Sequence, residues 1–104
     1  MVFQKTLSLA NGLNSLKSKL VAAGYTGPMW ADEIISKAPG ANWTTANTLD
    51  VAIGGAAMAA LDDGLRLAPG DKDLRDPAGK IDLTQIYYYA TDANQRVHVQ
   101  ISTQ

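Results

Sequence analysis

The stretch Gln85–Ile101, QIYYYATDANQRVHVQI, contains two alternating segments separated by a polar break. If the break at residues 92–95 is a turn, with an asparagine that tolerates positive φ near its tip, the two segments pair as an antiparallel β-hairpin. Burial of one face fixes the register, because a slip by one residue would mix the apolar and polar sets. The predicted inward set is Ile86, Tyr88, Ala90, Val97, Val99 and Ile101.

The outward face of this hairpin is predicted to be an interaction surface. Aromatic and guanidinium groups are over-represented among the residues that anchor protein interfaces. The alternative is that cross-strand aromatic pairs simply stabilise a half-solvated sheet. The candidate interface residues are Tyr87, Tyr89, Arg96, His98 and Gln100.

The last strand, residues 97–103, is predicted to have an open outer edge. A third strand next to it is not evident, and neither proline nor lysine interrupts this segment. Such residues normally protect an edge from pairing with other chains. We therefore expect self-association by strand addition at the end of the chain.

Upstream of the hairpin, the spacing of apolar residues predicts helices. Leucines at positions 9, 13, 16 and 20 fall on one helical face, and Gly24 and Pro28 end the segment. The first helix is expected at roughly residues 4–23, and a short second helix at residues 28–38 ends at Ala38-Pro39-Gly40.

The run from about Thr48 to Leu67 is apolar nearly all round and predicts the most buried element, a central helix. Gly54 and Gly55 fit this helix only if another backbone approaches closely there. The expected fold class is α+β, with two or three N-terminal helices packed on a C-terminal antiparallel β-hairpin. All 104 residues form a single domain on this interpretation.

The composition and charge of the chain argue against several kinds of metal site and against nucleic-acid binding. The chain has no cysteine and one histidine, so thiolate and multi-histidine metal sites are excluded. The aspartate-rich loop at residues 71–82 fails the calcium-loop pattern, because Arg75 and Asp76 occupy positions that need a ligand and a glycine. The net charge is −1 with scattered basic residues, which argues against nucleic-acid binding. No metal, cofactor or small-molecule ligand is expected.

The N-terminal segment lacks the pattern of a secretory signal peptide. The longest apolar run, Val51–Leu61, is shorter than the roughly 20 residues that span a bilayer. We expect a soluble protein made in the cytoplasm, without membrane association.

The function expected from the sequence is that of a non-enzymatic structural or interaction subunit that assembles with copies of itself or with a partner. Charged residues make up 18% of the chain against a usual ~25%, so little charge must be desolvated at an interface. Compositional analogy extends this expectation to a virion or filament component. The alternatives are a protein-binding inhibitor or immunity-type module, and a small enzyme in which His98 meets a carboxylate such as Asp82 or Asp92. Trp30 and Trp43 suit either the core or an interface.

Overall fold

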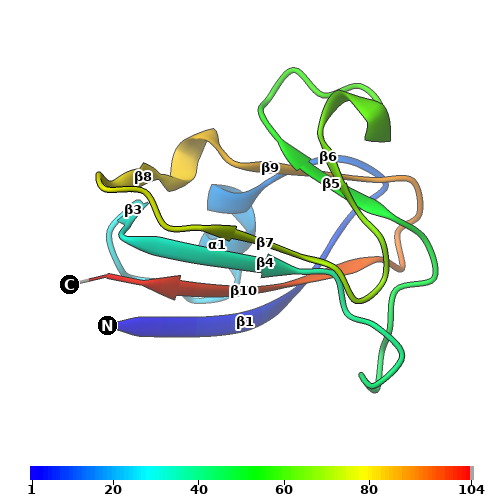
Figure 1. Ribbon diagram of the computed structural model, residues 1–104, viewed down its shortest axis with the longest axis horizontal. Helices are drawn as coiled ribbons and strands as arrows, with labels where there is room; N and C mark the ends of the chain where they lie inside the picture. Colours follow the sequence, from blue (N-terminus) through cyan, green and yellow to red (C-terminus); the bar gives the residue numbers. More distant parts are fainter. Residues whose placement is uncertain (104) are drawn as a thin grey trace.

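The computed structural model describes residues 1–103, which form an antiparallel β-structure with a single α-helix (Figure 1). The helix α1 covers Leu16–Ala22, and 3₁₀ turns η1 and η2 cover Leu61–Asp63 and Leu83–Gln85. The strands are β1 Val2–Ser8, β2 Gly12–Ser15, β3 Trp30–Ala31, β4 Glu33–Lys37, β5 Val51–Gly54, β6 Leu65–Leu67, β7 Lys72–Arg75, β8 Ile81–Asp82, β9 Tyr87–Ala90 and β10 Arg96–Ser102.

The strands pair as one long ribbon folded back on itself. The innermost pair is β5–β6, and β4–β7, β3–β8, β2–β9 and β1–β10 follow outward, all antiparallel. Two further pairings, β4–β10 and β5–β9, roll this ribbon into two four-stranded sheets. We call them sheet A, in the order β1-β10-β4-β7, and sheet B, in the order β2-β9-β5-β6; β3 and β8 form a separate two-stranded sheet. A folded ribbon of eight main strands in two sheets is the jelly-roll arrangement.

The core lies between sheets A and B and consists of alternate residues from their strands. On β10 every odd-numbered residue from Val97 to Ile101 is buried, and on β9 Tyr88 and Ala90 are buried. The hydroxyl of Tyr88 lies 2.7 Å from the Ser36 Oγ on β4, so a hydrogen bond links the two sheets inside the core. Leu16 and Leu20 of α1 are also fully buried and belong to the same cluster.

Two buried polar side chains hold the long connection between β4 and β5. The Gln95 Oε1 accepts hydrogen bonds from the amides of Thr48 and Leu49, both at 3.1 Å. Asn47 donates to the Arg96 carbonyl and accepts from the Arg96 amide, at 2.8 and 2.7 Å. Side chains thereby satisfy backbone groups that no strand partner reaches.

The two Ala-Pro-Gly motifs are turns that pack against each other. The Gly70 amide donates to the Ala38 carbonyl at 2.8 Å, and the Ala38 amide donates to the Asp71 carbonyl at 2.9 Å. A Cβ added to Gly40 would lie 2.9 Å from the Gly70 Cα. Glycine is therefore required at position 40 by close backbone approach.

The predicted α+β class is wrong, because the chain is mostly β and contains one short helix. The helix expected at residues 4–23 exists only as α1, and residues 2–15 form β1 and β2. The expected helix at 28–38 is β3 and β4, and the expected central helix from Thr48 to Leu67 is β5, η1 and β6. Pairing partners distant in sequence overrode the helical spacing of the leucines and alanines.

The predicted hairpin is also wrong. The segments at 85–101 do form strands, but β9 belongs to sheet B and β10 to sheet A, so they face each other across the core and do not pair. The terminal strand has no open edge, since β1 and β4 occupy its two sides. The predicted alternation of burial is nevertheless confirmed, because each sheet has one inward face.

Candidate interaction site

The five candidate interface residues lie on two separate faces. Tyr87 and Tyr89 point away from the core on sheet B, whereas Arg96, His98 and Gln100 point away from the core on sheet A. All five side chains are half-buried. Because the core separates the two outer faces, the structure does not bring the predicted cluster together.

His98 has a defined environment on the outer face of sheet A. Its Nδ1 lies 2.9 Å from the Thr6 Oγ1, and its ring lies 5.0 Å from the Trp43 ring, centroid to centroid. Partial burial and, secondarily, the charge of Lys37 lower the pKa of His98 below its ordinary value of 6.5. Within residues 1–103 no carboxylate is hydrogen-bonded to this imidazole, so the orienting partner of a catalytic histidine is not present there.

Both tryptophans are half-buried near the surface. The Trp43 ring packs against His98, and the Lys80 Nζ lies 4.3 Å from the centroid of the Trp30 ring, a cation–π contact. Lys80 also forms an ion pair with Asp32. These partners within the chain explain the position of each indole.

Three of the four aspartates at residues 71–82 have structural roles. The Asp71 carboxylate accepts from the Ala68 amide, Asp73 pairs with Arg75, and Asp82 accepts from the amide and hydroxyl of Thr84. The bonds from Thr84 lower the pKa of Asp82. No group of three potential metal ligands forms among the described residues.

Sheet A has two open edges, β1 and β7, and β1 is the longer strand. The Thr103 amide donates to the Met1 carbonyl and the Leu9 amide donates to the Gln95 carbonyl, so odd-numbered residues of β1 bond to β10. By the alternation of an antiparallel ladder, the backbone groups of Val2, Gln4, Thr6 and Ser8 point away from the sheet. On β7, the Ala38 amide donates to the Asp71 carbonyl, so the residues that bond to β4 are the odd-numbered ones. The backbone groups of Lys72 and Leu74 therefore point away from the sheet, as those of the even-numbered residues of β1 do.

Each open edge carries an exposed aliphatic side chain on the outer face of sheet A. Val2 is 60% exposed on β1, and Leu74 is 54% exposed on β7. In Figure 1, β1 and β7 lie on opposite sides of the β10–β4 pair. Neither strand contains a proline, and Lys5 and Lys72 are their only lysines.

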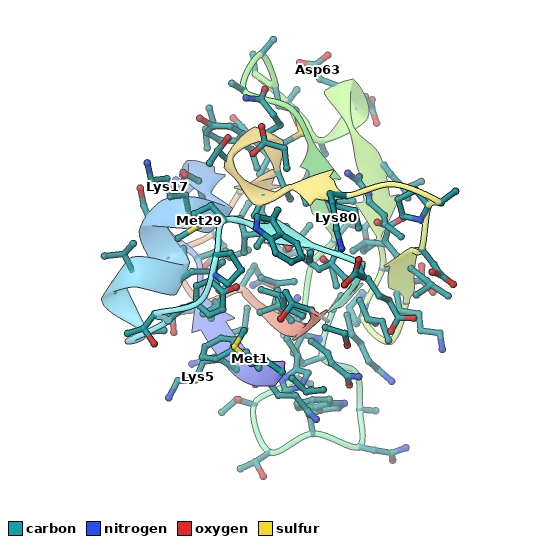
Figure 2. All side chains as sticks on the ribbon, turned by 90° about the vertical axis from the view of Figure 1, so that its left-hand side faces the viewer. Met1, Lys5, Lys17, Met29, Asp63 and Lys80 are labelled. Carbon is teal, nitrogen blue, oxygen red and sulfur yellow. The ribbon has the colours of Figure 1, made fainter. Side chains whose placement is uncertain are left out.

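A shallow groove runs along the open edge of β1. Its volume is about 230 Å³, and its walls are Lys5 to Ser8 of β1 on one side and Lys19, Ala22 and Ala23 of α1 on the other. Lys5 and Lys17 lie on this same side of the molecule in Figure 2. The lining includes no acidic residue, so the groove favours a partner that brings carboxylates.

Comparison of the chain with models of protein families, with curated proteins and with solved structures found no match. The virion and viral assignments taken from composition therefore gain no support from relatives. The jelly-roll topology does not replace them, because capsid, lectin and cupin domains share it and function depends on the site. No helix in residues 1–103 is long and apolar enough to cross a membrane.

The two edges were not predicted from the sequence, because most of β1 was expected in a helix and β7 in a loop. The alternation of Phe3, Leu7 and Leu9 with polar residues was the available signal for β1. The four-residue β7 contains a single apolar residue and gives no comparable signal.

Proposed function

We propose that the protein is a non-enzymatic interaction subunit that assembles with copies of itself by extending sheet A. The open β1 edge of one copy pairs with the open β7 edge of the next. The observation that carries this proposal is the complementarity of these two edges of a single sheet. An open edge with free backbone groups is a template for another strand.

The complementarity specifies a register. In sheet A, β1 and β7 run in opposite directions, so copies related by translation pair them antiparallel. Placing Val2 opposite Leu74 of a second copy aligns residues whose backbone groups both point outward. The same register places Gln4 opposite Lys72, again with both pointing outward, and the two exposed aliphatic side chains meet on one face.

This register also pairs charges. Lys5 lies opposite Asp71 of the second copy. The groove favours a partner with carboxylates, and in this register a second copy of the protein supplies one. The turn at residues 68–70 of that copy then approaches the groove between β1 and α1. The contact is heterologous, with a different surface from each copy, and therefore closes into a ring or continues as a filament.

The first experiment is sedimentation or light scattering over a range of concentrations. One strand pair buries less than the ~1,200 Å² of a stable interface, so we expect association at roughly 0.1–1 mM protein. Replacing Leu74 with lysine, or Val2 with lysine, should abolish self-association, because the contact needs both edges and charge at an edge blocks strand addition. Leu65→Lys is the matched control, since Leu65 is 53% exposed on the edge strand β6 of sheet B.

Mixing the two blocked variants distinguishes the proposed contact from its alternatives. Val2→Lys retains a native β7 and Leu74→Lys retains a native β1, so each should be monomeric alone and the mixture should form a heterodimer. A symmetric β1–β1 dimer would instead persist in Leu74→Lys. A wild-type chain that stays monomeric throughout the concentration range would refute self-assembly and favour the binding of an extended acidic segment of another protein.

A further inference from the structure

We infer that a hollow on the outer face of sheet A binds a small oxyanion, a carboxylate or a phosphate. This site borders the β7 edge, because Gly70 lines the hollow and also belongs to the turn that the proposed assembly brings toward a second copy. The inference does not depend on that assembly, and it goes against the expectation from sequence that no small molecule binds. The hollow has a volume of about 260 Å³ and lies where the loop after β4 meets the second Ala-Pro-Gly turn. Its lining is Lys37, Gly40, Ala41, Asn42, Trp43 and Gly70.

Lys37 lines this hollow and forms no ion pair within residues 1–103. Lys37 is the register partner of both His98 on β10 and Lys72 on β7. The ion pairs in residues 1–103 use other cations, namely Arg66, Arg75 and Lys80. Like charges directly opposite each other destabilise a sheet. The pair Lys37–Lys72 therefore costs stability, and an anion that binds Lys37 would offset part of this cost.

The acidic residues closest in sequence and register form no ion pair with Lys37 within residues 1–103. Asp71 accepts a hydrogen bond from the amide of Ala68 in its own turn, and Asp73 pairs with Arg75. Burial and, secondarily, the charge of Lys37 lower the pKa of His98, which is consistent with the proximity of the two side chains.

The loop also offers uncharged donors. The amides of Gly40, Ala41 and Asn42 donate no hydrogen bond to any acceptor in residues 1–103. The loop is held in place by the bond from the Trp43 amide to the Gly40 carbonyl and by the contact of Gly40 with the Gly70 backbone. Lysine ammonium and backbone N–H groups are the usual ligands of carboxylates and phosphates.

The size of the hollow limits the ligand. Pockets for drug-sized molecules have volumes of roughly 300–1,000 Å³. At about 260 Å³, this open hollow accommodates inorganic phosphate or a short carboxylate, and a mononucleotide would extend into solvent. The ligand we infer is accordingly one oxyanion group, free or at the end of a longer molecule.

Trp43 and His98 provide two readouts for the test. In a Trp30→Phe background Trp43 is the single tryptophan, and His98 is the single histidine of the chain. Potassium phosphate, potassium acetate and potassium chloride are added separately at pH 8 and constant ionic strength. We expect phosphate or acetate to produce a saturable change in Trp43 fluorescence and in the imidazole resonances of His98, and chloride to produce none. The oxyanion that saturates identifies the ligand class.

Three variants decide the result. Lys37→Gln should weaken binding by roughly tenfold to a hundredfold, the effect of losing one charge-assisted hydrogen bond. Ala41→Asp should abolish binding, because it adds a carboxylate to the lining. Lys17→Gln on α1 removes the same charge elsewhere and should leave affinity within about twofold. A linear response to all three salts, or equal affinities for Lys37→Gln and Lys17→Gln, would overturn the inference.

Discussion

Substitutions at the hydrogen bond between Tyr88 and Ser36 would show how much this contact contributes to holding sheets A and B together. Tyr88 is fully buried and Ser36 is 1% exposed, and their oxygen atoms are 2.7 Å apart. Burial raises the pKa of Tyr88 far above its ordinary value, so the hydroxyl is protonated at neutral pH. Each of the two hydroxyl groups has the other as its side-chain partner in residues 1–103.

Removing one hydroxyl leaves the other buried without a partner, and such a group costs about 1–3 kcal/mol. Tyr88→Phe and Ser36→Ala should therefore each lower the free energy of unfolding by about 1–3 kcal/mol. The double variant has no unpaired hydroxyl, so it should lose clearly less than the sum of the single losses, with a coupling of roughly 1–2 kcal/mol. Such losses are a large share of the ~5–15 kcal/mol typical of a domain.

Urea unfolding followed by tryptophan fluorescence measures these differences, and the slope of the transition checks that each variant unfolds in two states. Tyr87→Phe is the matched control, because Tyr87 is half-buried on the outer face of sheet B, and its loss should stay within about 0.5 kcal/mol. Additive losses in the double variant, or a Tyr88→Phe protein as stable as the wild type, would refute this account of the core.

Three further outcomes follow from the structure. Burial and a neighbouring lysine place the folded-state pKa of His98 below its unfolded value of 6.5. The neutral imidazole therefore contributes stability that is fully present above pH 6.5 and should decrease as pH falls through the folded pKa. This pH-dependent loss of stability should be absent from His98→Gln, as measured by unfolding at a series of pH values. Gly40→Ala should lower the midpoint of thermal unfolding, because its Cβ would lie 2.9 Å from the Gly70 Cα, whereas Gly55→Ala meets no atom within 4 Å and should not lower it. Gln95→Ala leaves two loop amides without their acceptor and should cost about 1–3 kcal/mol in urea unfolding, and an unchanged stability would contradict the anchoring role.

The sequence correctly indicated which residues of the last two strands face inward. Tyr88, Val97 and Val99 are buried, and Tyr87 and His98 are half-exposed, because alternation depends only on the local extended backbone. Which strand each segment pairs with depends on residues up to a hundred positions away. No local sequence pattern around His98 indicates that β1 and β4 lie on the two sides of its strand, β10.

The helix predictions failed for a related reason. Val51, Ala52 and Ile53 are all buried. Val51 and Ile53 lie in the core, whereas Ala52 lies on the outer face of sheet B, between Tyr89 of β9 and Arg66 of β6. A central strand buried on both sides is continuously apolar and resembles a buried helix. Gly54 is the last residue of β5 and Gly55 directly follows it, so neither lies in a helix.

The two candidate sites, the edges of sheet A and the proposed oxyanion hollow, differ in how much of each could be predicted from the sequence. An interaction by strand addition was expected, but at the last strand, which the structure places in the interior of sheet A. The oxyanion hollow unites Lys37, Trp43 and Gly70, which are separated in sequence and share no motif. Only the packing of the two Ala-Pro-Gly turns brings them together.

The nested pairing of the strands has a consequence for the order of folding. The β5–β6 tip closes the shortest loop, and every later pair encloses a longer segment of chain, so the conformational entropy lost on closure grows outward. A topology rich in such distant contacts is typical of domains that fold in milliseconds to seconds. Because β1 joins β10 in the outermost pair, we expect the β1 edge proposed for assembly to form last. A partly folded copy would then join the proposed assembly only through β7 and would not extend it, so the order of strand pairing would limit growth to fully folded copies.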